Sequence, residues 1–450
     1  MSSKIPVDSA PAEVSFWQAL AFWLKLGCIS FGGPAGQIAI MHQELVEKRR
    51  WISEKRFLHA LNYCMVLPGP EAQQLATYIG WLLHRTRGGI AAGGLFVLPS
   101  LILLILLSWL YIAFGHQPLM AGLFYGIKPA VIAIVLQACH RIGARTLKNN
   151  WLVAIAAASF LALFAFNLPF PAIIAAAAAI GYGGGKLRPQ LFQGGGHGAP
   201  GKSYGAALID DHTPTPPHAQ FRWPRLFAVL LCGMLLWALP MALLTMQFGW
   251  QHTFTQMGWF FTKAALLTFG GAYAVLPYVY QGAIAQYGWL SPVQMIDGLA
   301  LGETTPGPLI MVVAFVGFVG GYVHASFGPD QQLLAGALAA VIVTWFTFLP
   351  SFIFILAGGP LVESTHDDLK FTAPLTAITA AVVGVILNLA LFFAYHVLWP
   401  QGYGGHFDWL ATLLAAAAAL ALLRFKRNVI HVIAASAALG LLAKTVLPMP

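Results

Sequence analysis

Apolar runs dominate the chain and are separated by short breaks that contain Gly, Pro or charged residues. Runs such as Gly89–Phe114 and Phe371–Tyr395 approach or exceed the roughly 20 residues that cross a bilayer as a helix. They lack the strict alternation of β-barrel strands. The pattern therefore predicts an all-α polytopic membrane protein. The expected segments are 16–32, 57–83, 89–114, 119–140, 151–168 and 170–182, and then 226–246, 254–271, 292–323, 331–358, 371–396, 407–424 and 429–447.

Composition excludes an ordinary soluble fold. Of the 450 residues, 58% are hydrophobic and 9% are charged, whereas about 25% of a typical soluble domain is charged. Lys and Arg (24) exceed Asp and Glu (15), which gives a formal net charge of +9. Because the basic residues lie mainly in short loops, we interpret this excess as a signal of orientation in a lipid bilayer and not of nucleic-acid binding.

Residues 183–225 interrupt the apolar pattern with Gly- and Pro-rich sequence, including Gly183–Gly185 and Pro214–Pro217. Such a composition buries little apolar surface, so we predict a flexible linker. The linker histidines lack the spacing of metal ligands, which favours a solvated segment over a metal site.

The segments beyond the linker repeat those before it. An offset of 238 residues (263 − 25) superimposes Lys25 on Lys263 and Phe31-Gly32-Gly33 on Phe269-Gly270-Gly271. The same offset superimposes Pro68-Gly69-Pro70 on Pro306-Gly307-Pro308. Two homologous repeats are therefore expected. The predicted parts are an N-terminal repeat (1–182), the linker (183–225), a connecting transmembrane helix (226–246) and a C-terminal repeat (247–450).

The unpaired helix at 226–246 predicts inverted repeats. If the first repeat begins in the cytoplasm, six membrane elements return the chain there, and the seventh carries it across before the second repeat starts. Basic stretches such as Arg141–Lys148 and Arg424–Arg427 then fall on the inner side, as the positive-inside rule requires. This topology predicts a cytoplasmic N-terminus and a periplasmic C-terminus.

One basic loop, Glu47–Arg50 with Lys55 and Arg56, would lie outside if the first two segments each crossed the membrane. Both segments are interrupted, at Gly32-Gly33-Pro34 and at Pro68-Gly69-Pro70, where helical hydrogen bonding fails. If each segment instead turns back as a re-entrant hairpin, the loop moves inside. Two topologies thus remain, 13 crossings or nine crossings with four hairpins, and the charge pattern favours the hairpins.

The interrupted segments predict an anion site. Helices that restart after Pro34, Pro70, Ala272 and Pro308 would present free N–H groups and positive dipole ends. Breaks mirrored between inverted repeats are typical of a shared binding site near the membrane midplane. The alternative is a set of helix kinks that neighbouring helices tolerate. The predicted substrate-binding residues are Lys25, Gly32, Gly33, Pro34, Pro68, Gly69, Pro70, Lys263, Gly270, Gly271, Thr305, Pro306, Gly307 and Pro308.

Ionisable residues inside apolar segments extend this hypothesis. Lys25 and Lys263 occupy equivalent positions about two turns before their Gly-Gly breaks, and a cation there is costly unless it faces a cavity or snorkels. Lys128 is a third such cation. Glu71 and Glu303 flank the two Pro-Gly-Pro breaks, where a carboxyl group serves either proton coupling or helix capping.

The sequence contains no phosphate-binding loop, His-Glu-x-x-His, Gly-x-Ser-x-Gly or haem-attachment motif. We therefore predict neither enzymatic activity nor a cofactor or metal. The membrane context and the expected anion site together favour a transporter over an enzyme.

At its interrupted segments the sequence resembles the chromate ion transporter family in its long, two-domain form. The resemblance rests on Phe31–Gln37, Arg49-Arg50-Trp51, Leu67–Pro70 and Thr305–Pro308. It implies chromate export across the bacterial inner membrane, with chromate resistance as the outcome and sulfate as a competing analogue. Ala272 replaces the Pro of the first motif in the second half. A broader oxyanion transporter, a membrane chromate reductase, a channel and a homodimeric assembly stay open.

Overall fold

The computed structural model describes residues 11–31, 33–115, 117–192, 204–211, 213–364 and 372–446, and most of these residues are helical. Sixteen α-helices lie within the described ranges. The helices are α1 (Phe16–Ile29), α2 (Gly33–His42), α3 (Glu54–Val66), α4 (Glu71–Phe114), α5 (Pro118–Thr146), α6 (Asn150–Phe164), α7 (Phe170–Leu187), α8 (Trp223–Phe248), α9 (Thr253–Leu266), α10 (Ala272–Tyr280), α11 (Pro292–Thr304), α12 (Val312–Val323), α13 (Gln332–Ser364), α14 (Thr372–Leu398), α15 (Trp409–Leu423) and α16 (Val429–Val446).

The interrupted segments of the first repeat form helical hairpins. In the first hairpin, Arg49 beyond α2 lies 4.8 Å from the ring centroid of Phe22 on α1. In the second, the rings of Tyr63 on α3 and Tyr78 on α4 lie 6.0 Å apart. Each pair brackets a break, at residues 30–34 or 67–70, so the chain turns back at both places. The 14 residues of α1 span only about 21 Å, less than the roughly 30 Å hydrocarbon core.

The second repeat turns back in the same way. Phe260 on α9 stacks on Tyr278 of α10 with 4.7 Å between ring centroids, and Phe315 of α12 packs directly on Gly298 of α11. The chain therefore has four hairpin tips, which we call the apices: residues 30–34, 67–70, 268–271 and 305–308. This arrangement agrees with the hairpin interpretation of the sequence.

Helix α4 reverses direction at residues 84 and 85. The sequence predicted two separate segments here, 57–83 and 89–114, so it located the reversal only approximately. His84 and Arg85 have non-helical backbone angles, and Arg85 has φ 57°. The two arms of α4 then pack so closely that a Cβ on Gly88 would lie 2.2 Å from the Gly80 carbonyl oxygen. Glycine at this contact lets the chain reverse without a loop.

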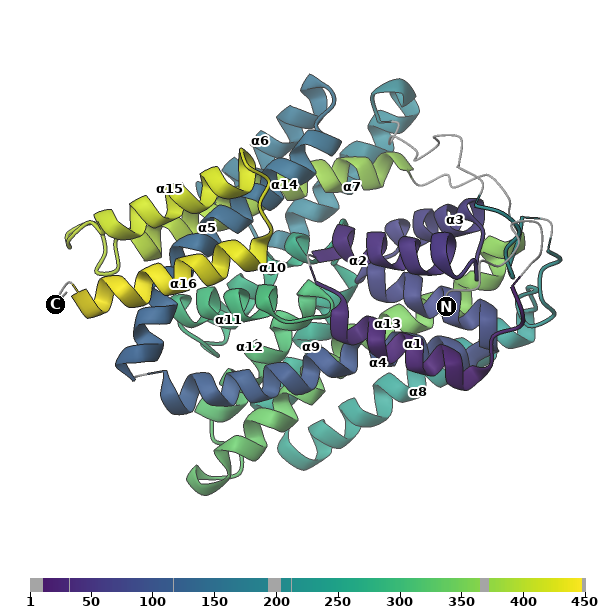
Figure 1. Cartoon of the computed structure of the whole chain (residues 1–450), viewed down its shortest axis with the longest axis horizontal. Helices are drawn as coiled ribbons and strands as arrows, with labels where there is room; N and C mark the ends of the chain where they lie inside the picture. Colours follow the sequence, from purple (N-terminus) through teal and green to yellow (C-terminus); the bar gives the residue numbers. More distant parts are fainter. Residues whose placement is uncertain are drawn as a thin grey trace, which may run out of the picture.

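The two repeats are interleaved (Figure 1). Helix α5 of the first repeat packs against α15 and α16 of the second, whereas α14 packs against α6 and α7. The long helices α4 and α13 also contact each other. Helix α8, which has no counterpart, packs at the edge against α13 and α9. The core of the molecule is thus built from both repeats at once.

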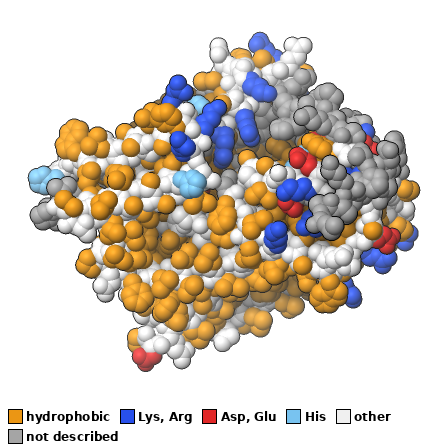
Figure 2. Space-filling model, in the orientation of Figure 1, with side chains coloured by type: hydrophobic (Ala, Val, Ile, Leu, Met, Phe, Trp, Pro, Cys, Tyr) orange, Lys and Arg blue, Asp and Glu red, His pale blue; other side chains and the backbone are white. Residues whose placement is uncertain are grey.

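The surface is that of a membrane protein. Seven described helices (α4, α5, α7, α8, α13, α14 and α16) are long and apolar enough to cross a membrane. Hydrophobic side chains cover most of the face in Figure 2, and Lys and Arg gather in its upper middle part and toward its right side. On α8 such exposed side chains include Leu231 and Leu243, which fits contact with lipid.

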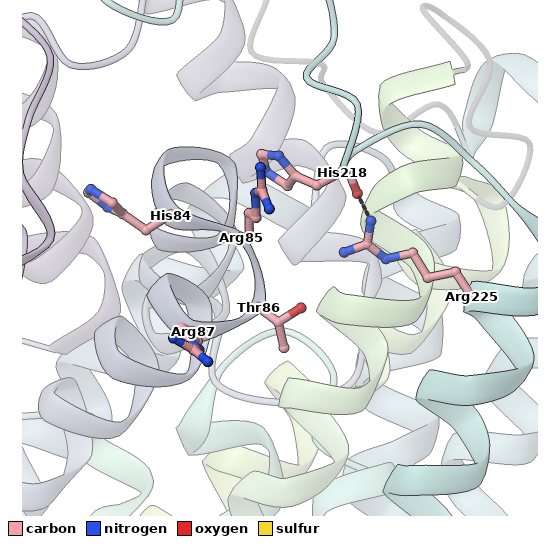
Figure 3. A pocket seen from close by; sticks show the side chains of 6 residues that line it. All are labelled: His84, Arg85, Thr86, Arg87, His218 and Arg225. Carbon is pink, nitrogen blue, oxygen red and sulfur yellow. Dashed lines mark hydrogen bonds between the residues drawn. The ribbon is translucent and has the colours of Figure 1, made fainter.

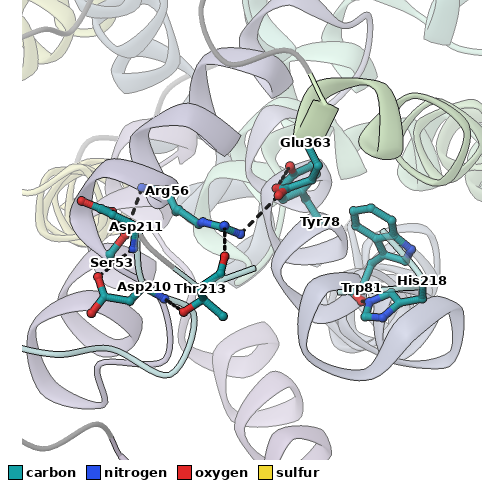
Figure 4. A network of polar contacts seen from close by, with 9 residues as sticks. All are labelled: Ser53, Arg56, Tyr78, Trp81, Asp210, Asp211, Thr213, His218 and Glu363. Carbon is teal, nitrogen blue, oxygen red and sulfur yellow. Dashed lines mark hydrogen bonds and ion pairs between the residues drawn. The ribbon is translucent and has the colours of Figure 1, made fainter. Parts of the chain in front are cut away.

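The described part of the predicted linker contacts the first repeat. Ile209 pairs with Ile52 in a parallel β-bridge, and Arg56 donates a hydrogen bond of 2.7 Å to the Thr213 carbonyl oxygen. Arg56 also forms an ion pair of 3.2 Å with Glu363 at the end of α13 (Figure 4). Buried apolar residues such as Ile209 add to these contacts, and the flexibility of the linker stays a prediction.

Candidate functional site

Each Pro-Gly-Pro apex depends on a glycine that adopts a left-handed backbone. Gly69 has φ 127° and Gly307 has φ 110°, angles that residues with a Cβ rarely adopt. The flanking prolines end one helix and allow the next to begin, at Glu71 for α4 and at Leu309 for the 3₁₀ turn that leads into α12. The predicted helix breaks are confirmed.

The four apices meet in two reciprocal pairs. The Gly69 amide donates a hydrogen bond of 2.7 Å to the Thr268 carbonyl oxygen, and the Gly307 amide donates one of 2.8 Å to the Ser30 carbonyl oxygen. Ser30 and Thr268 are separated by 238 residues, as are Gly69 and Gly307. Each Pro-Gly-Pro motif is therefore bonded to the end of the first hairpin helix of the other repeat.

Buried glutamine side chains of the first repeat add hydrogen bonds to the paired apices. The Gln37 amide donates a hydrogen bond to the Gly307 carbonyl oxygen, and the Gln74 amide donates one of 2.8 Å to the Pro68 carbonyl oxygen. Gln37, Gln73 and Gln74 are at most 1% exposed. The side-chain oxygens of Gln73 and Gln74 have no hydrogen-bond partner among the described residues, which leaves polar capacity beside the apex.

Two serines that sequence reasoning did not assign to the site pack behind the apices. A Cβ on Gly69 would lie 2.3 Å from Ser351 Oγ, and a Cβ on Gly307 would lie 2.7 Å from Ser100 Cβ. Both serines follow a proline inside a long helix, at Pro99 in α4 and at Pro350 in α13. The repeated Leu-Pro-Ser motif was the available signal, but it carried no information about which apex it would face.

The remaining apex residues lie where the helices restart. Helix α2 begins at Gly33, so Pro34 stands in its first turn, and α10 begins at Ala272 directly after Gly271. Pro34 and Gly271 are neighbours, since a Cβ on Gly271 would lie 4.0 Å from Pro34 Cγ. Thr305 is buried. Gly32 lies outside the described residues.

The two predicted coupling carboxylates lie beside different apices. Glu303 is 8% exposed and accepts a hydrogen bond from the Tyr273 hydroxyl group on α10. Glu71 is the first residue of α4. Both carboxylates interact electrostatically with α5, Glu71 with Arg145 and Glu303 with Arg141.

The predicted lysines take no part in the apical hydrogen bonds. Lys25 is exposed on α1. Lys263 is half-buried, and its Nζ lies 5.6 Å from the ring centroid of Trp259. Trp259 in turn lines a cavity of about 430 Å³ with Gln256 and Gln286. The assignment of both lysines to substrate binding stays a prediction.

A third intramembrane cation is paired. Lys128 Nζ lies 3.6 Å from Asp297 Oδ2, and the Tyr111 hydroxyl group donates a hydrogen bond of 2.8 Å to the same oxygen. Asp297 is 2% exposed, and its other carboxylate oxygen has no partner among the described residues. This cluster joins α4, α5 and α11.

Fold and site together define a multi-pass helical membrane protein in which interrupted hairpins converge inside the molecule. The chain belongs to the chromate transporter family, whose model matches residues 17–182 and 255–441. The matched regions exclude the linker and α8.

Proteins of known sequence extend this assignment. A chromate transport protein of Pseudomonas aeruginosa is 36% identical over 383 residues, which cover 84% of this chain and 81% of the relative. A chromate transport protein of Cupriavidus metallidurans is 28% identical over 438 residues, which cover 97% and 95% of the two chains. The uncharacterized transporter YwrA of Bacillus subtilis matches 38% of this chain but 96% of its own length. No solved structure matches the chain significantly.

Proposed function

We propose that this protein exports chromate from the cytoplasm across the bacterial inner membrane and so confers resistance to chromate. The observation that carries the proposal is the meeting of four interrupted hairpins through reciprocal hydrogen bonds at Gly69 and Gly307. Two relatives that are named chromate transport proteins match this chain over most of their length, which supports chromate as the substrate. The N-terminus would be cytoplasmic and the C-terminus periplasmic.

The apices suit an oxyanion for electrostatic reasons. Helices α2, α4 and α10 begin there, and α12 begins one 3₁₀ turn later. Each helix N-terminus carries free N–H groups and about half a positive charge. Chromate offers several acceptor oxygens and two negative charges, so it can engage more than one helix end. Lys25 and Lys263 would attract the anion toward the two sides of this centre.

The repeats would act by alternating access. Inverted repeats in secondary transporters exchange conformations around a site that they share. The 238-residue correspondence between the paired groups supports such an arrangement. In this mechanism the two apical pairs lie in the same barrier and open in turn to the cytoplasm and the periplasm.

Counterflow in proteoliposomes tests the substrate. Vesicles loaded with unlabelled chromate should accumulate labelled chromate from outside, and Lys25→Ala and Lys263→Ala should each slow this accumulation. Lys148→Ala, which removes an exposed loop lysine, serves as the matched control. Accumulation no faster than in empty liposomes would contradict transport, whereas normal rates in both lysine variants would contradict only their role.

Proton coupling through Glu71 and Glu303 needs a separate measurement. An imposed pH gradient should drive chromate movement in the unmodified protein. Glu303→Gln and Glu71→Gln should weaken this dependence while counterflow without a gradient continues. Glu13→Gln, which changes an exposed carboxylate, is the control. Equal gradient dependence in all four proteins would remove both carboxylates from the coupling scheme.

A broader oxyanion transporter is the second candidate, because the N–H groups and dipole ends of helices provide little discrimination between tetrahedral dianions. Labelled sulfate and chromate should be compared in the same vesicles. Faster sulfate exchange, with chromate as a weak competitor, would favour the broader function. If exported chromium is recovered outside as Cr(VI), the result supports transport over membrane-bound reduction.

Cysteine labelling tests the proposed orientation. Ser53→Cys and Ser291→Cys, placed singly in a cysteine-free background, occupy equivalent positions in the two repeats. The hairpin topology predicts that a membrane-impermeant reagent added outside labels Ser291→Cys but not Ser53→Cys. Labelling of both positions from the same side would contradict inverted repeats.

A further inference from the structure

A basic cavity lies at the reversal of α4, away from the apices. It has a volume of about 580 Å³ and is lined by His84, Arg85, Thr86, Arg87, His218 and Arg225. The lining comes from three parts of the chain, since His218 belongs to the linker and Arg225 to the first turn of α8. In Figure 3, Arg85 extends toward His218 while Arg225 approaches from α8.

The backbone holds one of these arginines in an unfavourable conformation. Arg85 has φ 57° and ψ −158°, a region that is essentially restricted to glycine and costs about 1–3 kcal/mol for other residues. The nearby glycines Gly88 and Gly89 serve the close contact between the arms of α4. A charged side chain therefore occupies a position where glycine would fit the backbone better, which points to a role for the guanidinium group.

No described side chain neutralises the charges around the cavity. The described residues of its lining are three arginines, two histidines and a threonine, with no carboxylate. Among the described residues, no salt bridge involves Arg85, Arg87 or Arg225. Burial lowers the pKa of His218, and the nearby charges of Arg225 and Arg85 lower it further. Such a cluster repels itself unless an anion is present.

Fixed geometry distinguishes the cavity from a loose group of surface charges. The His218 ring donates a hydrogen bond of 2.9 Å to the Trp81 carbonyl oxygen and packs edge-on against the Trp81 ring. Arg225 donates a hydrogen bond to the His218 carbonyl oxygen. The linker is thus bonded to both α4 and α8, and its position sets the distance between the arginines.

Exposed apolar side chains on α8 favour a lipid as the source of the anion. Trp223 and Phe227 are 62% and 63% exposed and stack on each other beside Arg225. Tryptophan at the end of a membrane helix is typical of the interface between headgroups and hydrocarbon. A headgroup phosphate in the cavity would leave its acyl chains free to lie along α8.

We propose that this cavity binds the phosphate group of an anionic phospholipid on the cytoplasmic side of the membrane. Arginine suits this ligand because its planar group donates two parallel hydrogen bonds to phosphate oxygens. Arg85 and Arg225 would bind the phosphate from α4 and α8, and the bound lipid would hold the linker against both helices. This inference does not depend on the transported substrate.

Thermal unfolding of the full-length protein in a neutral detergent tests the proposal. Phosphatidylglycerol should raise the unfolding temperature more than phosphatidylcholine, and native mass spectrometry should show it bound. Arg85→Gly removes the guanidinium and relieves the backbone strain. Loss of a charge-assisted contact should weaken phosphatidylglycerol binding by about tenfold or more. The variant should stay folded without lipid.

Lys426→Gly is the matched control, because Lys426 is an exposed basic residue with φ 50° outside the cavity. It should bind phosphatidylglycerol as the unmodified protein does. Glycerol 1-phosphate provides the remaining arm: stabilisation by this compound, lost in Arg85→Gly, would assign the same site to a free phosphate compound. Equal phosphatidylglycerol binding by Arg85→Gly and the unmodified protein, or no preference over phosphatidylcholine, would overturn the proposal.

Discussion

The glycine of the first Pro-Gly-Pro apex allows a quantitative test of the apical contacts. Gly69→Ala introduces a Cβ where φ is 127°, at 2.3 Å from Ser351 Oγ and 2.6 Å from Gln74 Nε2. The backbone strain costs about 1–3 kcal/mol, and overpacking of the buried contact costs about 1–3 kcal/mol more. The expected loss is therefore about 2–6 kcal/mol, a large part of the stability of an ordinary domain.

Two further glycines separate the contribution of backbone strain from that of overpacking. Gly33 has φ 70° but no atom within 4 Å of an added Cβ, whereas Gly94 has neither a positive φ nor such a contact. Gly33→Ala should therefore show the strain alone, and Gly94→Ala, in a helix interior, should be neutral or stabilising by up to about 1 kcal/mol. The predicted order of stability is Gly94→Ala, then Gly33→Ala, then Gly69→Ala.

Reversible unfolding in mixed micelles and chromate counterflow measure the two consequences. Gly69→Ala should lower both stability and transport, and Ser351→Gly should restore part of the stability by removing the closest atom. A coupling energy of about 0.5–3 kcal/mol is typical of residues in contact. If Gly69→Ala unfolds like the unmodified protein, the apical geometry derived above is wrong. A coupling energy of zero between Gly69→Ala and Ser351→Gly would exclude Ser351 as the obstacle.

Three other features give smaller tests. Gln37→Val copies the residue at the equivalent position of the second repeat, Val275, and should lower the free energy of unfolding by about 1–3 kcal/mol because the Gly307 carbonyl loses its partner. Gln117→Val, at an exposed position whose side chain makes no capping hydrogen bond, should change it little. Lys128→Met should destabilise the protein because Asp297 stays buried without its cation, and the double variant Lys128→Met/Asp297→Asn should recover stability in the same unfolding assay; no recovery would contradict the pairing. Since burial lowers the pKa of His218 below its usual 6.5, its contribution to linker stability should be complete above that pH and decline as pH falls. The amide protection factors of residues 204–211, corrected for the intrinsic exchange rate, should therefore fall at pH 5.5 more than they do in His218→Gln, and an equal fall would contradict the role of His218.

The breaks and the hairpins were predictable because they leave local signals. Gly33, Gly69 and Gly307 are followed by proline in the sequence, and such pairs favour a turn. The signal is not sufficient by itself, because Gly359-Pro360 lies inside α13. The misplaced basic loop at Glu47–Arg50 indicated that the chain turns back. These signals depend on backbone chemistry and on charge near the membrane, and both are properties of short segments.

The partners across the two repeats were not predictable in this way. Nothing in the sequence around Gly69 specifies that its amide bonds to Thr268, because that contact depends on how the hairpins pack. The interleaving of α5 with α15 and α16 is a property of the whole chain. The contacts of the linker were not predictable either, because its average composition concealed a short apolar stretch, Ala206–Ile209, of which Ala207 and Ile209 are buried.

The apices are reciprocal in backbone bonding but unequal in side-chain chemistry. At the 238-residue offset, Gln37 corresponds to Val275, Glu71 to Leu309 and Gln74 to Val312. The first repeat therefore supplies polar groups around the meeting point, while the second supplies an apolar wall that is at most 3% exposed. At these three positions the first repeat would face the proposed anion with polar side chains, while Glu303 and Thr305 are buried polar residues that the second repeat adds beside its own apex. The combined variant Gln37→Val/Val275→Gln, which moves the amide to the other repeat, should consequently stay folded but transport chromate more slowly.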